Sequence, residues 1–153
     1  MNPADFVYVT VIAAPPEKVW QALTTAEFTL QYWHATKVDS RWEVGGEVLF
    51  MVADGDDERV GCRGQVLAVD PPRHLSYTWS FPGNPEVADE EPSRVSFTLE
   101  PLDGHTRLTV VHDSFPEGSK MQGMVTAGWP HVLSGLKTLL ETGRAIDFSA
   151  LPH

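Results

Sequence analysis

The sequence predicts an α+β fold in which one antiparallel β-sheet is covered on one face by a long C-terminal helix. Apolar and polar residues alternate with a period of two in several segments between residues 38 and 112, which is typical of strands with one buried face. Residues 130–142 instead repeat their apolar side chains with a helical period. The chain has 153 residues, 42% of them hydrophobic. That is enough for one packed core, so we expect a single domain over residues 1–153.

The N-terminal segment predicts one strand followed by two short helices. Residues 6–13 are rich in β-branched and aromatic side chains, which favours a strand. The two prolines at 15–16 end this strand and suit the first turn of a helix. Thr24 and Glu27 have the spacing of a capping box, so a second short helix is expected to begin there.

The middle of the chain predicts an antiparallel meander, because its strand-like segments are separated by short turns. Glycines 45–46 suit a tight turn after the first of these segments, and residues 70–73 (DPPR) suit another. The six expected strands cover residues 38–43, 47–53, 60–69, 74–81, 93–100 and 105–112.

The C-terminal helix is expected over residues 130–142, with Gly143 as its C-cap. Residues 119–128 have an earlier helical pattern, which Pro130 is expected to kink or interrupt. No other expected element is long enough to cover the sheet. A curved sheet around this helix is hard to fill with side chains alone to the interior packing density of about 0.74, so we expect an apolar cavity between the two.

Four segments of the sequence resemble a known superfamily in the same order along the chain. They are residues 14–23 (APPEKVWQAL), 42–46 (WEVGG), 70–79 (DPPRHLSYTW) and 128–143 (GWPHVLSGLKTLLETG). This is the SRPBCC, or START-like, helix-grip superfamily, and the most similar branch is that of homologues of the activator of the heat-shock-protein-90 ATPase (the AHSA-type C-terminal domain). The resemblance implies a seven-stranded curved antiparallel sheet around a long C-terminal helix. It also implies two short helices between strands 1 and 2, with these two strands at the sheet edges.

Nine residues on the inward faces of the expected elements are candidates for the lining of the cavity. Their bulk and apolar character suit a site for a small hydrophobic ligand. For each of them the alternative is ordinary packing in a filled core. They are Trp33, Trp42, Phe50, Tyr77, Trp79, Phe97, His112, Trp129 and Leu133.

The histidines and the single cysteine predict neither a metal site nor a bound cofactor. No pair of histidines has metal-ligand spacing on one element, and no cysteine or carboxylate completes a cluster. His112 follows the inward parity of its strand, so it is either a hydrogen-bonded core residue or a polar anchor or acid/base group inside the cavity. Cys62 is expected to be a buried structural thiol.

The charge balance excludes several partners. The 21 acidic side chains outnumber 11 basic ones, for a formal net charge of −10, which argues against nucleic acids and anionic membrane surfaces. There is no apolar run of the length of a membrane span and no basic leader, so we expect a cytoplasmic protein without membrane insertion. The acidic segments 54–59, 82–92 and 113–119 should lie at one end of a meander. If that end is the cavity mouth, neutral or cationic ligands are preferred over anions.

The leading functional interpretation is binding of a small apolar or aromatic molecule, with no cofactor. The resemblance implies a second one, an interaction protein that regulates a chaperone ATPase, for which a stress-response role is plausible. A weaker alternative is a cyclase- or hydrolase-like enzyme, since some START-like relatives are enzymes. That alternative requires polar groups such as His112 or Tyr77 inside the cavity, because strand parity places Arg63 and Arg94 outside. Homodimer formation stays an open alternative.

Overall fold

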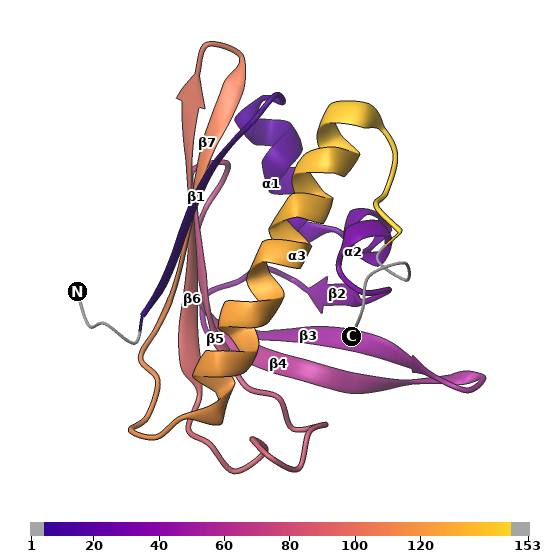
Figure 1. Cartoon of the computed structure of the whole chain (residues 1–153), viewed down its shortest axis with the longest axis vertical. Helices are drawn as coiled ribbons and strands as arrows, with labels where there is room; N and C mark the ends of the chain where they lie inside the picture. The colour runs from indigo at the N-terminus through magenta and orange to yellow at the C-terminus, as the bar shows by residue number, and fades with distance from the viewer. Residues whose placement is uncertain (1–4, 148–153) are drawn as a thin grey trace.

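The computed structural model describes residues 5–147 and confirms an α+β fold, a seven-stranded antiparallel sheet bent around a long C-terminal helix (Figure 1). Two short helices lie between the first and second strands, as the resemblance implies. In chain order the elements are β1 (Phe6–Ile12), α1 (Pro16–Thr24), α2 (Ala26–Tyr32), β2 (Lys37–Ser40), β3 (Glu47–Asp54), β4 (Asp57–Asp70), β5 (His74–Trp79), β6 (Ser93–Leu102), β7 (His105–Asp113) and α3 (Lys120–Thr142).

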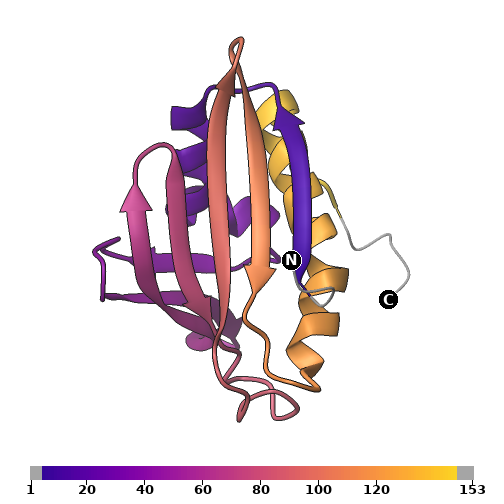
Figure 2. The ribbon, with the colours of Figure 1, turned by 90° about the vertical axis from the view of Figure 1, so that its left-hand side faces the viewer.

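The strands follow the order β1-β7-β6-β5-β4-β3-β2, so β1 and β2 form the two edges. Strands β2 to β7 form the predicted meander, and β1 extends the sheet by pairing with β7, with Val9 opposite Thr109. Figure 2 looks onto the outer face of the sheet, and α3 lies behind it. The helix therefore covers only the inner face, where the apolar side chains of alternating strand positions are buried.

The bend of the sheet is concentrated at β4. Its ladder with β3 shifts register between Phe50 and Met51, and its ladder with β5 shifts between Val66 and Ala68. Such bulges bend a strand and increase its twist. At Gly64 the neighbouring strand comes so close that an added Cβ would lie 1.8 Å from the carbonyl oxygen of Thr78, so only glycine fits. As a result β3 and β4 cross beneath the first half of α3 in Figure 1 instead of running parallel to it.

Two expected boundaries near the N-terminus are wrong for local reasons. β2 ends at Ser40 instead of residue 43, and Trp42 has a φ of 54°, which is outside the extended region. The capping box at Thr24 does not form. The Thr24 hydroxyl donates a hydrogen bond to the carbonyl of Trp20 within α1, and Thr25 is the N-cap of α2.

The expected interruption of the last helix at Pro130 is also wrong, because α3 runs continuously from Lys120 to Thr142. Proline removes one backbone donor, which leaves the carbonyl of Thr126 without its helical partner. Thr126 is exposed, so that carbonyl can bond to solvent instead. The helix ends as predicted at Gly143, which has a φ of 77° and donates to the carbonyl of Leu139.

The N-terminus of α3 is held by a carboxylate from the loop between β5 and β6. The Oε2 atom of Glu90 accepts from the backbone N–H groups of Lys120 (2.9 Å) and Met121 (3.2 Å). Its Oε1 atom accepts from the hydroxyl of Ser119, the helix N-cap. A negative charge at this end stabilises the helix dipole and satisfies donors that have no partner within the helix.

We expect Glu90→Ala to lower the melting temperature by about 2–4 °C, because a lost N-terminal cap costs about 1 kcal/mol in a chain of this size. Thermal unfolding followed by circular dichroism measures the change. Glu86→Ala is the matched control, since Glu86 is an exposed acid of the same loop. Equal melting temperatures for the two variants would show that the Glu90 contacts do not stabilise α3.

Candidate functional site

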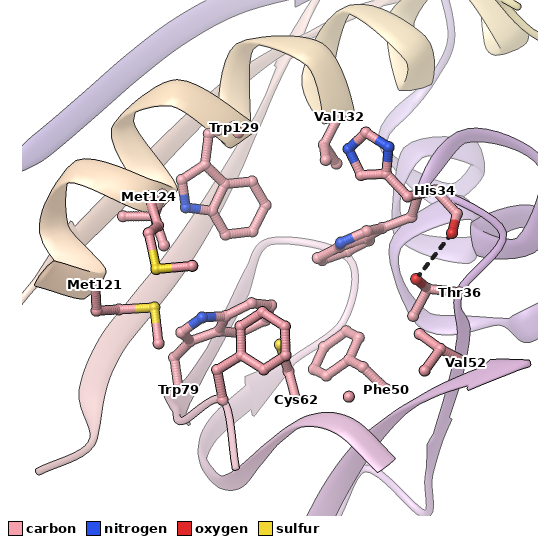
Figure 3. Close-up of a pocket in the computed structure, with 15 residues that line it drawn as sticks. His34, Thr36, Phe50, Val52, Cys62, Trp79, Met121, Met124, Trp129 and Val132 are labelled. Atoms are coloured by element: carbon pink, nitrogen blue, oxygen red, sulfur yellow. Dashed lines mark hydrogen bonds between the residues drawn. The ribbon is translucent and has the colours of Figure 1, made fainter. Parts of the chain in front are cut away.

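A pocket of about 320 Å³ lies between the bent sheet and the first half of α3 (Figure 3). Its lining comes from four parts of the chain: the turn after α2, strands β3 and β4, the end of β5, and α3. These parts are distant in sequence and are brought together by the bend at β4 and by the docking of α3. The space expected between sheet and helix is therefore present and is not filled by side chains.

Five of the described lining residues carry Trp or Phe rings, namely Trp33, Phe50, Trp79, Phe81 and Trp129. Trp33 stands at the centre of this group, with its ring centroid 5.0 Å from that of Phe50 and 5.4 Å from that of Trp129. The ring of Trp79 is 5.0 Å from Phe50 and 5.8 Å from Trp129. These tilted and edge-on contacts have the spacing that aromatic pairs prefer, so the rings support one another in fixed positions.

The side of the pocket formed by α3 is more adaptable. Met121 and Met124 contribute thioether side chains, and Gly128 contributes no side chain at all. Positions 124, 128 and 132 are four residues apart, so they lie on one face of the helix. A Cβ added at Gly128 would meet no atom within 4 Å. Methionine side chains can repack around different shapes, and the glycine leaves space beside them.

The pocket carries no fixed charge. None of the described lining residues is Asp, Glu, Lys or Arg. The pKa of His34 is lowered first by burial and then by electrostatic repulsion from His131, so its imidazole is neutral at pH 7. Burial raises the pKa of the Cys62 thiol to about 12, so it is a thiol and not a reactive thiolate.

A buried hydrogen-bond chain connects the pocket wall to the sheet. The indole nitrogen of Trp129 donates to Nδ1 of His112 over 3.0 Å. Because an indole nitrogen can only donate, Nδ1 must accept and the ring proton must reside on Nε2. Nε2 then donates to the hydroxyl of Ser93 over 2.6 Å, and that hydroxyl donates to the carbonyl of Trp79.

His112 is neutral in this series of hydrogen bonds. It is completely buried, and burial lowers its pKa to about 3 although the carboxylate of Asp113 acts in the opposite direction. Protonation at Nδ1 would break the bond from Trp129. The ring is thus a structural acceptor and donor for the helix–sheet contact.

Comparison with known proteins places the chain in a family. A profile of the family described as Activator of Hsp90 ATPase homolog 1-like protein matches residues 13–141. The chain belongs to this family. A search of curated proteins gave no match.

Several solved structures of other proteins share the fold. Protein MLL2253 from Mesorhizobium loti is 32% identical, with 89% of this chain and 96% of that chain aligned at a TM-score of 0.71. DynU16, from the dynemicin biosynthetic locus, is 25% identical over 94% of this chain and 49% of its own, also with a TM-score of 0.71. An Hsp90 activator from Plasmodium falciparum is 19% identical over 89% of this chain and 95% of its own, and its TM-score of 0.71 shows similarity of fold alone.

The structure brings four of the nine sequence-predicted lining residues to the pocket, namely Trp33, Phe50, Trp79 and Trp129. The other five lie outside its lining: Trp42, Tyr77, Phe97, His112 and Leu133. Tyr77, Phe97 and Leu133 are fully buried in the adjoining core. Trp42 packs against Tyr77, and its indole nitrogen donates to the carbonyl of Thr24. His112 accepts from Trp129 and is not among the lining residues, so the structure gives no support to His112 as an anchor or acid/base group inside the cavity.

Other lining residues were missed by the sequence analysis. Met121, Met124 and Gly128 lie in the segment 119–128, whose pattern predicts a helix but not which of its faces is buried. The spacing of Met121, Met124 and Gly128 was the available signal, because these positions share one side of a helix. Val52 lies within β3, and Phe81 lies just after β5. Both share the strand parity of the predicted candidates Phe50 and Trp79, which was the available signal.

The expected ring of acidic residues around one end of the sheet does not form as predicted. In Figure 1 the β3–β4 hairpin and the β5–β6 loop project in different directions. Glu90 caps α3, and Asp113 forms a bidentate pair with Arg94, each bond 2.9 Å long. The bend at β4 separates turns that a flat meander would keep together.

No helix of residues 5–147 has the length and apolar character required to cross a bilayer. Over the same residues, no three His, Cys, Asp or Glu side chains are grouped as metal ligands.

We expect acid to destabilise the fold through His112. An unfolded histidine ionises near pH 6.5, whereas the folded ring has a pKa of about 3, so the unfolded chain binds the extra proton as the pH falls below about 6.5. The contribution of His112 to the free energy of unfolding is fully present above that pH. It decreases by about 1.4 kcal/mol for each further pH unit toward 3. His112→Gln should be less stable at pH 8, by about 1–3 kcal/mol from broken buried hydrogen bonds, but should lose this part of the pH dependence.

Urea unfolding at pH 8 and pH 5 measures both effects. His105→Gln is the control, because this histidine is exposed at the β6–β7 turn. The same pH dependence in wild type and His112→Gln would contradict a neutral, buried His112.

Proposed function

We propose that the protein binds a small, uncharged, hydrophobic or aromatic molecule in the pocket between α3 and the sheet. The observation that carries this proposal is an open space of about 320 Å³ walled by aromatic rings and methionines, without a charged side chain among its described lining residues. This volume and composition are typical of sites for small apolar ligands. The similarity to DynU16, a protein of a biosynthetic locus, supports a role that involves a small molecule.

The charge of the ligand follows from the pocket itself. A charged group transferred from water into this wall would lose its hydration and find no ionised partner there. Anions are further disfavoured by the net charge of −10 on the chain. We therefore expect neutral molecules to bind best. The sequence predicts neutral or cationic ligands, and the uncharged pocket wall leaves only the neutral ones.

Regulation of a chaperone ATPase is a second candidate function, which membership of the family described as Activator of Hsp90 ATPase homolog 1-like protein supports. A surface for such a partner is available on the outer face of β1, where Val7, Val9 and Val11 are exposed, Val9 by 57%. Stimulation of a purified Hsp90 ATPase that is unchanged by filling the pocket would favour this function over ligand binding.

We expect Gly128→Leu to abolish binding of N-phenyl-1-naphthylamine, a neutral aromatic probe whose fluorescence rises in apolar sites. The new side chain would project from the pocket face of α3, between positions 124 and 132. Replacing a helical glycine also favours the helix by up to about 1 kcal/mol, so a loss of binding would not reflect unfolding.

Gly123→Leu is the matched control for this experiment. Gly123 lies on the same helix with no atom within 4 Å of an added Cβ, but it is outside the pocket lining. It should bind the probe as wild type does. Equal probe binding by all three proteins would place the probe elsewhere and overturn the proposal.

We expect 2-naphthamide to displace the probe at least about tenfold more effectively than 2-naphthoate at pH 7.5, because only the carboxylate must lose the hydration of a full charge. Competition titrations at low and moderate salt measure the ratio. Raising the salt should improve binding of the anion slightly through screening of the acidic chain. Tighter binding of the carboxylate at low salt is the contradictory outcome.

A further inference from the structure

The pocket wall contains a polar group that the protein leaves without a partner. The indole nitrogen of Trp79 is buried and has no hydrogen-bond acceptor among residues 5–147. Trp79 is 7% exposed and lines the pocket at the end of β5. The chain supplies acceptors to two other tryptophans, His112 for the buried Trp129 and the carbonyl of Thr24 for the partly buried Trp42.

An unpartnered buried donor is rare, because its desolvation is not compensated. In Figure 3 the nitrogen lies on the edge of the Trp79 ring that faces the methionines of α3. Thioether sulfurs are only weak acceptors, and they can move aside. The hydroxyl of Thr36, another polar group of the pocket lining, is bonded to the carbonyl of His34 and not to Trp79. The residues around Trp79 thus give its N–H no acceptor, and a molecule in the pocket reaches this N–H once a methionine side chain moves aside.

The position of this donor is fixed before any ligand arrives. The Trp79 ring contacts Phe50, Trp33, Trp129 and His112, with centroid distances between 5.0 and 6.3 Å. Because the ring is already held on several sides, it loses little further conformational freedom when a ligand binds. A hydrogen bond from its N–H is therefore stronger and more directional than one from a mobile side chain.

We propose that the indole N–H of Trp79 is the polar anchor of the pocket and that the ligand carries a neutral hydrogen-bond acceptor, such as a ketone oxygen, on an aromatic or aliphatic body. This inference rests on the proposed function and specifies its ligand class. The acceptor oxygen would lie beside Trp79, and the apolar body would fill the space between Trp33, Phe50 and the methionines.

The test compares fluorene with 9-fluorenone, which share a tricyclic frame and differ by one ketone oxygen. Their dissociation constants are measured by displacement of N-phenyl-1-naphthylamine from wild type and from Trp79→Phe. The phenyl ring keeps an aromatic wall but has no donor. We expect the preference for the ketone, the ratio of the two constants, to fall about fivefold in Trp79→Phe, the size of one net hydrogen bond.

Phe50→Leu is the matched control, because it removes an aromatic ring of the same wall that carries no donor. It should weaken both probes alike and leave the ratio unchanged. A ratio that is the same in wild type and Trp79→Phe would overturn this inference while leaving the proposed function intact. If neither probe binds wild type, the proposed function itself fails.

A second measurement on the wild-type protein avoids any dependence on the folding of Trp79→Phe. In ¹H–¹⁵N spectra, the indole proton of Trp79 should move downfield with 9-fluorenone and not with fluorene, because a hydrogen bond to oxygen deshields it. Equal shifts with the two probes would also overturn the inference.

Discussion

The bond from Trp129 to His112 is the contact on which the arrangement of helix and sheet depends. Trp129 reaches from the middle of α3 to β7, and both partners are buried. Because the rings of Trp33 and Trp79 rest against Trp129, the same side chain that fastens the helix also positions the pocket wall. The neutral state of His112 is a requirement of this contact, since a second ring proton would compete with the indole for Nδ1.

The composition of α3 determines where the interior is filled and where it is hollow. Beyond Trp129 the helix presents Leu133, Leu136 and Leu139, which are buried in the core. Before it, the helix presents methionines and Gly128 over the strands that bend at β4. Branched leucines with few rotamers fill the space on one side, whereas flexible thioethers and a missing side chain leave it open on the other. The second half of α3 therefore packs in the core, whereas its first half lines the pocket.

Much of the fold could be predicted from the sequence because its signals are local. Alternation with a period of two located every strand of the meander, and the helical period located the second half of α3. The pocket was predicted less well. Strand parity shows which residues face inward, but not which positions along the strand lie beside the pocket. Tyr77 and Trp79 share a face of β5, yet only Trp79 reaches the pocket. The positive φ of Trp42 and the continuation of α3 through Pro130 depend on surroundings that the local sequence does not show.

The two candidate functions use opposite faces of the sheet, which affects how they are to be separated. The pocket occupies the inner face beneath α3, and the exposed valines of β1 occupy the outer face. A substitution in one does not touch the other, so each can be removed alone. The open pocket is not needed to present a protein-binding strand, and filling it would give the helix and sheet more apolar contacts. An unfilled space with an unpartnered donor in its wall is therefore better explained by a small molecule than by a protein partner.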